Sequence, residues 1–287
     1  MAKACLGPRE ASPEAEVAEE DLGVLIDFVG ASVGVRLRDY RPSTIVRRAA
    51  NRLKLAGCRD CAEYLDLLAR EPEEAKRLVE YVTIKWSCFF REATVFARLR
   101  EQVLPDLAER YGEELAIWSA GCGRGEEPYS LSIALREMAA AGQPVRATIY
   151  GTDIDETALR AAGERVYAQS ALNETPKRLV DAYFTEQPGR CGPAFRLHDE
   201  VAASVRFRRH DLLSGEGHPE RRAFHLVLCR NVLIYFQRQA QERVLDLLSA
   251  SLLPGGYLCL GTAEQLPASH SQLFETVDHR DRIYRKL

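Results

Sequence analysis

The alternation of short apolar runs with helical segments, which begins after Glu114, constrains the fold more than any other feature of the chain. The runs are a few residues long and rich in β-branched and aromatic residues, as buried strands are. Strands that alternate with helices indicate βαβ units and a parallel sheet covered on both faces. We therefore predict a Rossmann-like α/β domain over residues 114–287, with strands at LAIWSAG, ATIYGTD, SVRFRRHD, FHLVLCRN and GYLCLGT.

The residues before this domain follow a helical pattern. Between Leu22 and about Tyr81, apolar residues recur every three or four positions, as they do on one face of a helix. Ile45, Ala49 and Leu53 share such a face, and Gly57 is placed to end that helix. We predict a small helical domain at 21–92.

Three further segments complete the predicted organisation. Residues 1–20 are acidic and rich in Ala, Glu and Pro, which favours a mobile tail. Residues 93–113 continue the helical pattern and are predicted to form a connecting helix. Pro and Gly signals between 173 and 203 interrupt the βαβ pattern, so we predict a small antiparallel β-subdomain inserted there.

Composition excludes several classes of protein. A net charge of -3 argues against a protein that mainly coats nucleic acid. No apolar run approaches the roughly 20 residues that span a bilayer, and the first twenty residues lack the apolar core of a secretory signal. Only Cys58 and Cys61 have CxxC spacing, and no second pair completes a zinc site. We expect a cytoplasmic protein without a metal.

The first predicted strand runs into a glycine-rich turn, SAGCGRGEEPYS. Gly121, Gly123 and Gly125 would let the backbone approach a ligand closely. The turn lacks the Lys-Ser/Thr ending of a phosphate-binding loop. Glu126 and Glu127 follow directly and would repel a pyrophosphate, so the pattern predicts a nucleoside that carries positive charge instead of phosphate. S-adenosylmethionine, with its ammonium and sulfonium groups, fits this description.

An acid follows the second predicted strand, where Rossmann-like folds bind ribose. Asp153 comes directly after the strand and is predicted to accept hydrogen bonds from both ribose hydroxyls. Asp155 is better placed to cap the next helix. The glycine turn, its acid and the βαβ pattern together predict a nucleoside site at this edge of the sheet.

Four segments carry a resemblance to a known family. They are TIKWSCFFRE at 83–92, WSAGCGRGEEPYSLSI at 118–133, CRNVLIYF at 229–236 and GYLCLGTAE at 256–264. They resemble the CheR family of chemoreceptor glutamate O-methyltransferases, and the resemblance runs from about residue 22 to the C-terminus. It implies a helical N-terminal domain followed by a class I methyltransferase domain with an inserted antiparallel β-subdomain.

The resemblance also implies roles for particular residues. Arg91, in the Phe-Phe-Arg triplet, and Tyr235 would flank the transferring methyl group as catalytic residues. The family usually has Asn, any residue, then Ser or Thr before this triplet, whereas this chain has Lys85-Trp86-Ser87. Lys85 cannot accept a hydrogen bond as Asn does, and a second cation near a sulfonium would weaken cofactor binding. The implied cofactor contacts are Ser87, Arg91, Gly121, Glu127, Asp153, Asp211, Leu212, Arg230 and Asn231.

The implied reaction moves a methyl group from S-adenosylmethionine to a glutamate side chain. A glutamate has a pKa of about 4.3, so it is ionised at pH 7 and needs no general base. Arg91 would orient the planar carboxylate through its fork of N–H donors, and Tyr235 would donate to the second oxygen. The products would be a glutamate methyl ester and S-adenosylhomocysteine. Residues 229–236 lack the prolines of the motif that DNA and amine methyltransferases carry there, which speaks against nitrogen as the acceptor.

The predicted helical domain contains a strongly basic segment. Between Arg36 and Arg59, eight basic residues stand against one acid, Asp39. This imbalance favours a negatively charged partner, and Arg48 and Arg52 are the predicted contact residues. Under the family resemblance, the partner is the acidic helical bundle of a chemoreceptor. Nucleic acid is the rival partner, with Arg and Lys on phosphates.

Two alternative functions stay open. One keeps the enzyme class but changes the acceptor to a nucleic acid or a small molecule. The other is a non-catalytic regulator that keeps the fold and binds the cofactor as a signal. We expect a monomer that forms no stable complex with nucleic acid and does not insert into a membrane.

Overall fold

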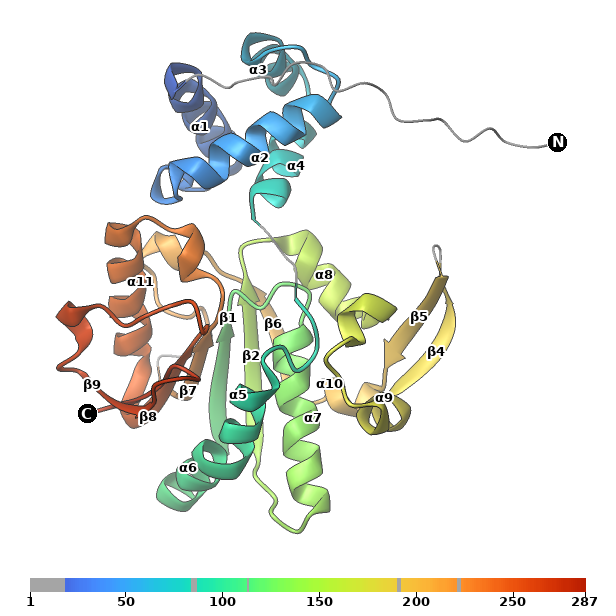
Figure 1. The fold of residues 1–287 in the computed structure, drawn as a ribbon, viewed down its shortest axis with the longest axis vertical. Helices are drawn as coiled ribbons and strands as arrows, with labels where there is room; N and C mark the ends of the chain where they lie inside the picture. The colour runs from blue at the N-terminus through green and yellow to red at the C-terminus, as the bar shows by residue number, and fades with distance from the viewer. Residues whose placement is uncertain (1–18, 84–86, 113, 190–191, 221–222) are drawn as a thin grey trace. The chain divides into compact units, whose positions relative to one another are not determined.

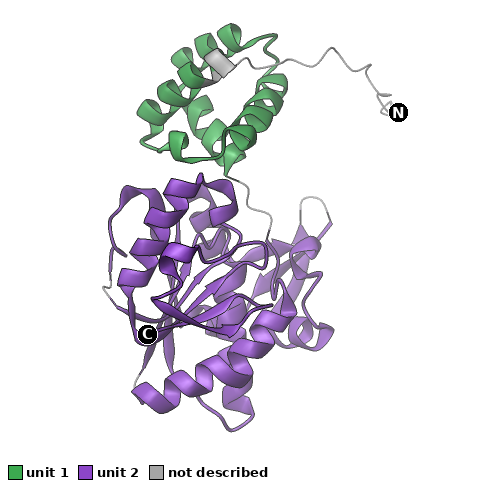
Figure 2. Ribbon diagram, turned by 60° about the vertical axis from the view of Figure 1, so that its left-hand side comes forward, with its two compact units in different colours: residues 1–84 green, residues 85–287 purple. Residues whose placement is uncertain are grey.

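A computed structural model describes residues 19–83, 87–112, 114–189, 192–220 and 223–287. The chain divides into two compact units, Met1–Ile84 and Lys85–Leu287, which we call the helical unit and the α/β unit (Figure 2). The division falls before the Phe-Phe-Arg triplet, whereas the sequence pattern placed it after residue 92. The reason is burial, because Phe89 and Phe90 belong to the core of the α/β unit.

The helical unit contains helices whose ends follow from local chemistry (Figure 1). Proline occupies the first turn of two of them, where its missing N–H costs nothing. Asp60 caps a third by accepting a hydrogen bond from the N–H of Glu63. The elements are α1 Glu19–Val33, η1 Leu37–Asp39, α2 Pro42–Leu55, α3 Cys61–Arg70 and α4 Pro72–Val82.

The predicted apolar face of α2 is confirmed. Ile45, Ala49 and Leu53 are all buried, each with 1% of its surface exposed. Gly57 follows the helix with a φ of +79°, a conformation that glycine adopts without strain.

Within the described residues, the α/β unit is built on a seven-stranded sheet in the order β6-β2-β1-β7-β8-β10-β9. The pairs from β6 to β8 are parallel, and β10 pairs antiparallel with both β8 and β9. All residues of β1 and β7 are buried, so both faces of the sheet are covered. The strands are β1 Leu115–Ala120, β2 Ala147–Asp153, β6 Val205–Arg209, β7 Phe224–Cys229, β8 Leu252–Leu260, β9 Phe274–Asp278 and β10 Ile283–Lys286.

The predicted Rossmann-like architecture is therefore confirmed, with the apolar runs as its parallel strands. Helices connect these strands as βαβ units require (Figure 1). The main ones are α7 Glu126–Ala140, α8 Glu156–Glu164 and α11 Arg238–Ser251. The stretch before β1 is helical throughout, with α5 Ala93–Arg98, a π-helical turn at Leu99–Val103 and α6 Leu104–Tyr111.

A small antiparallel sheet in the order β3-β5-β4 is inserted between α8 and β6 (Figure 1). Its strands are β3 Val166–Ala168, β4 Phe184–Gly189 and β5 Gly192–Leu197, with α9 Lys177–Tyr183 before β4. The sheet begins earlier than residue 173, because β3 pairs with β5 across about thirty residues. A strand of three residues has no periodicity to reveal it.

None of the helices in the described ranges is long and apolar enough to cross a membrane.

A buried histidine in the α/β unit makes stability depend on pH. His218 lies edge-on to Trp118 and Phe224, and its Nδ1 accepts a hydrogen bond from the N–H of Glu220. Burial, together with the nearby His210 ring, lowers the pKa of His218 from 6.5 to about 4. In the unfolded chain His218 becomes protonated below about pH 6.5. In the folded protein it stays neutral down to about pH 4. Stability is therefore lost as pH falls through this window.

We expect His218→Asn, whose Oδ1 can replace Nδ1 as acceptor, to lose less stability than the parent over that window. The difference should reach about 3 kcal/mol at pH 4. Urea unfolding followed by tryptophan fluorescence at pH 7, 5.5 and 4 measures it. Identical pH slopes for the two proteins would show that His218 does not carry this dependence.

Candidate active site

The glycine turn after β1 is held in a conformation that requires glycine. Gly121, Gly123 and Gly125 have φ values of +74°, +57° and +89°. A Cβ on Gly121 would lie 2.5 Å from Cγ2 of Val232, which follows β7. The turn after β1 and the loop after β7 therefore pack directly on each other.

The acid predicted after β2 lies against this turn. Asp153 accepts a hydrogen bond from the N–H of Gly123 at 2.8 Å and another from the N–H of Asp155 at 2.9 Å. Asp155 caps α8, accepting from the N–H groups of Thr157 and Ala158, as the sequence pattern indicates. The structure thus brings together the glycine turn and its acid.

The two glutamates that open α7 differ in environment. Glu127 accepts hydrogen bonds from Ser119 Oγ at 2.7 Å and from the guanidinium of Arg230 at 3.1 Å. Glu126 is 3% exposed, and its Oε2 has no hydrogen-bond partner among the described residues. Burial raises the pKa of Glu126 to about 7. Burial therefore favours the neutral form of Glu126 at the start of α7.

Arg230, after β7, bridges two other segments. Its side chain is 2% exposed and donates to Glu127, to Glu92 Oε2 at 3.0 Å and to the carbonyl oxygen of Arg91 at 2.7 Å. The guanidinium also lies 5.5 Å from the ring centroid of Phe96. These contacts make Arg230 a residue that joins the Phe-Phe-Arg segment to the glycine turn.

The Phe-Phe-Arg segment has an unusual backbone. Phe90 and Glu92, on either side of Arg91, have φ values of +57° and +61°, which are rare for residues with a Cβ. Phe89 packs edge-on to Tyr167 and Phe184, with ring centroids 4.8 and 5.0 Å apart. Packing and hydrogen bonds therefore hold the strained backbone on both sides of Arg91.

Hydrogen bonds to distant residues complete this arrangement. The N–H of Phe90 donates to Ser130 Oγ, and the N–H of Glu92 donates to Glu174, each at 2.9 Å. Arg91 is half-buried, as is Ser87. Lys85 and Trp86, the departure from the family pattern, lie outside the described residues.

The loop after β7 holds the other predicted residues. Asn231 has a φ of +59°, and Tyr235 lies half-buried in a short 3-10 helix, η5 Leu233–Tyr235. The buried carboxylate of Glu264, after β8, accepts hydrogen bonds from backbone N–H groups of this loop. Sequence reasoning missed Glu264, although it ends the GYLCLGTAE segment that carried part of the resemblance.

Asp211 and Leu212 lie at the end of β6, next to the end of β2. The N–H of His210 donates to the carbonyl oxygen of Asp153 at 3.0 Å, which joins the two strand ends. Asp211 caps a short 3-10 helix, η4 Leu212–Ser214, by accepting from the N–H of Leu213. The predicted contacts after β1, β2, β6 and β7 therefore all lie at the carboxyl edge of the sheet.

The chemistry of this edge fits a nucleoside that carries positive charge. Glu127 and Asp153 supply carboxylates, and hydrogen bonds from Ser119 and Gly123 hold their oxygens in place. A cationic ligand gains from such carboxylates, whereas a phosphate would be repelled.

The two arginines predicted to bind a partner have intramolecular contacts within the helical unit. Arg52 donates through Nε and Nη2 to Glu74 at 2.7 and 2.6 Å, and Tyr64 donates to the same carboxylate. Arg48 donates to the carbonyl oxygen of Tyr81 at 2.7 Å. Both arginines therefore join α2 to α4, the helix that carries Glu74 and Tyr81.

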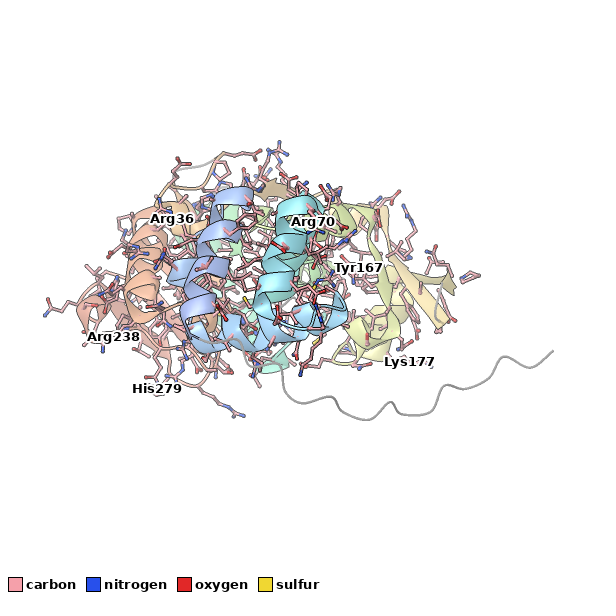
Figure 3. The ribbon with its side chains drawn as sticks, turned by 90° about the horizontal axis from the view of Figure 1, so that it is seen from above. Arg36, Arg70, Tyr167, Lys177, Arg238 and His279 are labelled. Atoms are coloured by element: carbon pink, nitrogen blue, oxygen red, sulfur yellow. The ribbon has the colours of Figure 1, made fainter. Side chains whose placement is uncertain are left out.

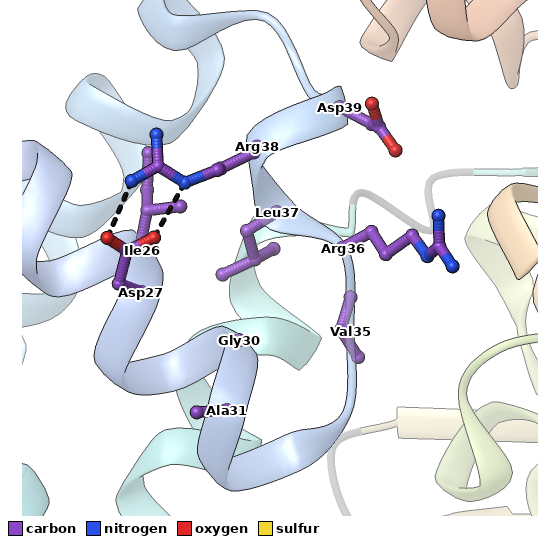
Figure 4. A pocket seen from close by; sticks show the side chains of 9 residues that line it. All are labelled: Ile26, Asp27, Gly30, Ala31, Val35, Arg36, Leu37, Arg38 and Asp39. Atoms are coloured by element: carbon purple, nitrogen blue, oxygen red, sulfur yellow. Dashed lines mark hydrogen bonds and ion pairs between the residues drawn. The ribbon is translucent and has the colours of Figure 1, made fainter.

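Other cations of the basic segment face solvent. Arg36, Arg47 and Lys54 are exposed, and Arg36 lines a pocket between α1 and η1 in which Arg38 pairs with Asp27 (Figure 4). Figure 3 shows Arg36 and Arg70 on the helical unit, and Lys177 and Arg238 on the α/β unit.

Comparison with known families agrees with this geometry. Residues 85–283 match the model of the CheR methyltransferase, SAM binding domain, and residues 20–83 match that of the CheR methyltransferase, all-alpha domain. The chain belongs to the CheR methyltransferase family. The resemblance seen in the motifs is confirmed, and so is S-adenosylmethionine as the cofactor.

Curated relatives of this CheR chain include proteins of similar length. It is 32% identical to "Chemotaxis protein methyltransferase 2" of Pseudomonas aeruginosa over 90% of this chain and 91% of that protein. It is 32% identical to "Putative methyltransferase Cher3" of Pseudomonas putida over 93% and 96%. A third relative, "Uncharacterized 104.1 kDa protein in hypE 3'region" of Rhodobacter capsulatus, is 32% identical over 93% of this chain, which spans only 28% of its length.

Proposed function

We propose that this S-adenosylmethionine-dependent methyltransferase acts in the cytoplasm on glutamate side chains of bacterial chemoreceptors and forms glutamate methyl esters. Relatives named chemotaxis protein methyltransferase support a role in chemotaxis. The observation that carries the proposal is the bridge from Arg230 to Glu92, the Arg91 carbonyl and Glu127. It holds the candidate acceptor-orienting arginine beside the glycine turn.

The proposed reaction needs orientation more than proton transfer. When bound, S-adenosylmethionine supplies an activated methyl group on a sulfonium. The acceptor glutamate is already ionised at neutral pH, so no side chain has to remove a proton. Positioning of the acceptor then accounts for the protein's main contribution.

Arg91 and Tyr235 are the proposed positioning groups. The strained backbone around Arg91 fixes where its side chain begins, and a guanidinium fork suits a planar carboxylate. Tyr235 would donate one hydrogen bond to the second oxygen from the loop after β7. Ser87, Gly121, Glu127, Asp153, Asp211, Leu212 and Asn231 are the proposed cofactor contacts, with Arg230 holding Glu127 in place.

The test is a choice among acceptors. The protein is incubated with methyl-labelled S-adenosylmethionine and, separately, cytoplasmic fragments of chemoreceptors, total RNA and duplex DNA. Label on the receptor fragment alone supports the proposal. Label on nucleic acid would favour a nucleic-acid methyltransferase. If no acceptor is labelled although the protein binds the cofactor with full affinity, a non-catalytic regulator would be favoured.

We also propose that the basic segment docks the acidic helical bundle of the receptor. Arg48 and Arg52 shape this surface, but reversal of Arg52 would break its ion pair with buried Glu74 and so disturb folding. Arg47 and Lys54 are exposed on the same helix, which makes them the sharper probes.

We expect Arg47→Glu with Lys54→Glu to raise the KM for receptor about tenfold at low salt and leave S-adenosylhomocysteine affinity unchanged. Charge reversal acts mainly on association, and salt screens it. Methylation rates at low and high ionic strength measure the effect. Arg238→Glu with Arg280→Glu makes the same charge change on the α/β unit. Equal losses in the two double variants would contradict a docking role for α2.

A further inference from the structure

The carboxylate of Glu264 is the centre of a hydrogen-bond cluster that ties together two loops of the α/β unit. Glu264 is 4% exposed. Its Oε2 accepts from the N–H groups of Gly261 at 2.7 Å and Asn231 at 2.9 Å. Its Oε1 accepts from the N–H groups of Val232 at 2.9 Å and Ile234 at 3.2 Å. Both oxygens of this buried carboxyl group therefore accept hydrogen bonds from backbone N–H groups.

These donors converge because of the local backbone. Asn231 has a φ of +59°, which turns the N–H groups that follow β7 toward one point. A carboxylate at that point satisfies buried N–H groups that helix or sheet hydrogen bonds do not reach. The side chain of Gln241 donates to the carbonyl oxygens of Leu233 and Phe236 in the same loop. Glu264 thus binds backbone N–H groups of the loop after β7, and Gln241 binds backbone carbonyl oxygens of the same loop.

The cluster leaves little room for movement. A Cβ on Gly261 would lie 2.7 Å from the N atom of Asn231 and 2.8 Å from Oε2 of Glu264. Val232, whose N–H binds Glu264, places its methyl groups where a Cβ of Gly121 would stand. A shift of the carboxylate would therefore move both the loop after β7 and the glycine turn.

We propose that Glu264 is a positioning residue that sets the loop carrying Asn231 and Tyr235, and through Val232 the glycine turn, in the geometry that binds S-adenosylmethionine. It touches neither cofactor nor acceptor in this role. The proposal rests on the proposed function only through Tyr235. Its test uses S-adenosylhomocysteine binding, which needs no receptor, so failure of receptor methylation would leave this test intact.

Glu264→Gln is the direct probe because it keeps the side-chain shape. The amide has one acceptor oxygen and turns two N–H donors toward backbone N–H groups, so part of the cluster is lost. We expect the Kd for S-adenosylhomocysteine to rise at least about tenfold, measured by titration calorimetry at a temperature where circular dichroism shows the variant folded.

Two further variants make the test decisive. In Gly261→Ala, the added Cβ would push apart Glu264 and the N–H of Asn231, so S-adenosylhomocysteine binding should also weaken. This variant keeps the proposal testable if Glu264→Gln fails to fold. Glu137→Gln is the matched control, because Glu137 accepts from Tyr183 on the same unit, in the last turns of α7. Its affinity should stay within about twofold of the parent.

If Glu264 contributed only to stability, a variant that is folded would still bind S-adenosylhomocysteine with the parental affinity. A folded Glu264→Gln protein that binds S-adenosylhomocysteine within twofold of the parent would overturn the proposal. So would a loss of affinity in Glu137→Gln equal to that in Glu264→Gln, or a folded Gly261→Ala protein with parental affinity.

Discussion

Arg91→Ala is expected to lower methyl transfer to receptor roughly a hundredfold, while S-adenosylhomocysteine affinity stays within a few-fold of the parent. The proposed guanidinium fork orients the acceptor carboxylate, and alanine at this position removes every donor. The backbone contacts of this segment use the Phe90 N–H, the Glu92 N–H and the Arg91 carbonyl oxygen, none of which the substitution deletes. Initial rates and titration calorimetry measure the two quantities.

Asp153→Ala is the matched comparison for Arg91→Ala. Asp153 holds the N–H of Gly123, and its removal should weaken S-adenosylhomocysteine binding first. Arg91→Lys should recover little of the lost turnover, because an ammonium is a point charge without a fork. If Arg91→Ala weakens cofactor affinity as much as it lowers turnover, Arg91 binds the cofactor and does not orient the acceptor.

Arg230→Met is expected to lower the free energy of unfolding of the α/β unit by about 3 kcal/mol, because it leaves partly buried Glu92 and Glu127 without their cation. Like charges would then face each other where the Phe-Phe-Arg segment meets the glycine turn. Cofactor affinity should fall as well, since Glu127 keeps only its hydrogen bond from Ser119. Urea unfolding and calorimetry on the same samples measure both effects.

Arg238→Met provides the control for Arg230→Met. The side chain of Arg238 is 85% exposed and pairs with Glu242 one helical turn away. Exposed pairs of this kind contribute little, so the unfolding midpoint should not change. An Arg230→Met protein as stable as the Arg238→Met protein would show that the buried bridge does not hold the segments together.

The features predicted from the sequence are those that depend on neighbours along the chain. The apolar runs locate the parallel strands because burial on both faces leaves a continuous hydrophobic signal. The glycine turn and Asp153 were found because each directly follows a strand, and the strand ends share one edge. Asp155 was recognised as a cap from its place before a helix.

The features missed depend on contacts between distant residues. The residues that Glu264 binds after β7 lie about thirty positions earlier in the chain, and no local pattern marks that partnership. The sequence shows Arg230 only as a charged residue that follows a strand. Its hydrogen-bond partners come from the Phe-Phe-Arg segment and from α7. Arg52 belongs to a charge run that suggests a solvated or docking surface, whereas its side chain reaches Glu74 on α4.

The domain boundary illustrates the same limit. The Phe-Phe-Arg segment follows the helical pattern closely along the chain, so the sequence alone places Phe89 and Phe90 with the helical domain. Burial of both rings in the core of the α/β unit assigns the segment to that unit.

The chemical bond formed with the acceptor is the most direct test of glutamate methylation by this protein. A receptor fragment labelled by this protein is digested, the labelled peptides are sequenced by mass spectrometry, and a second portion is exposed to mild alkali. We expect label on glutamate side chains that alkali releases as methanol, as an ester requires. Label that resists alkali, or that lies on lysine, arginine or another nitrogen, would contradict it.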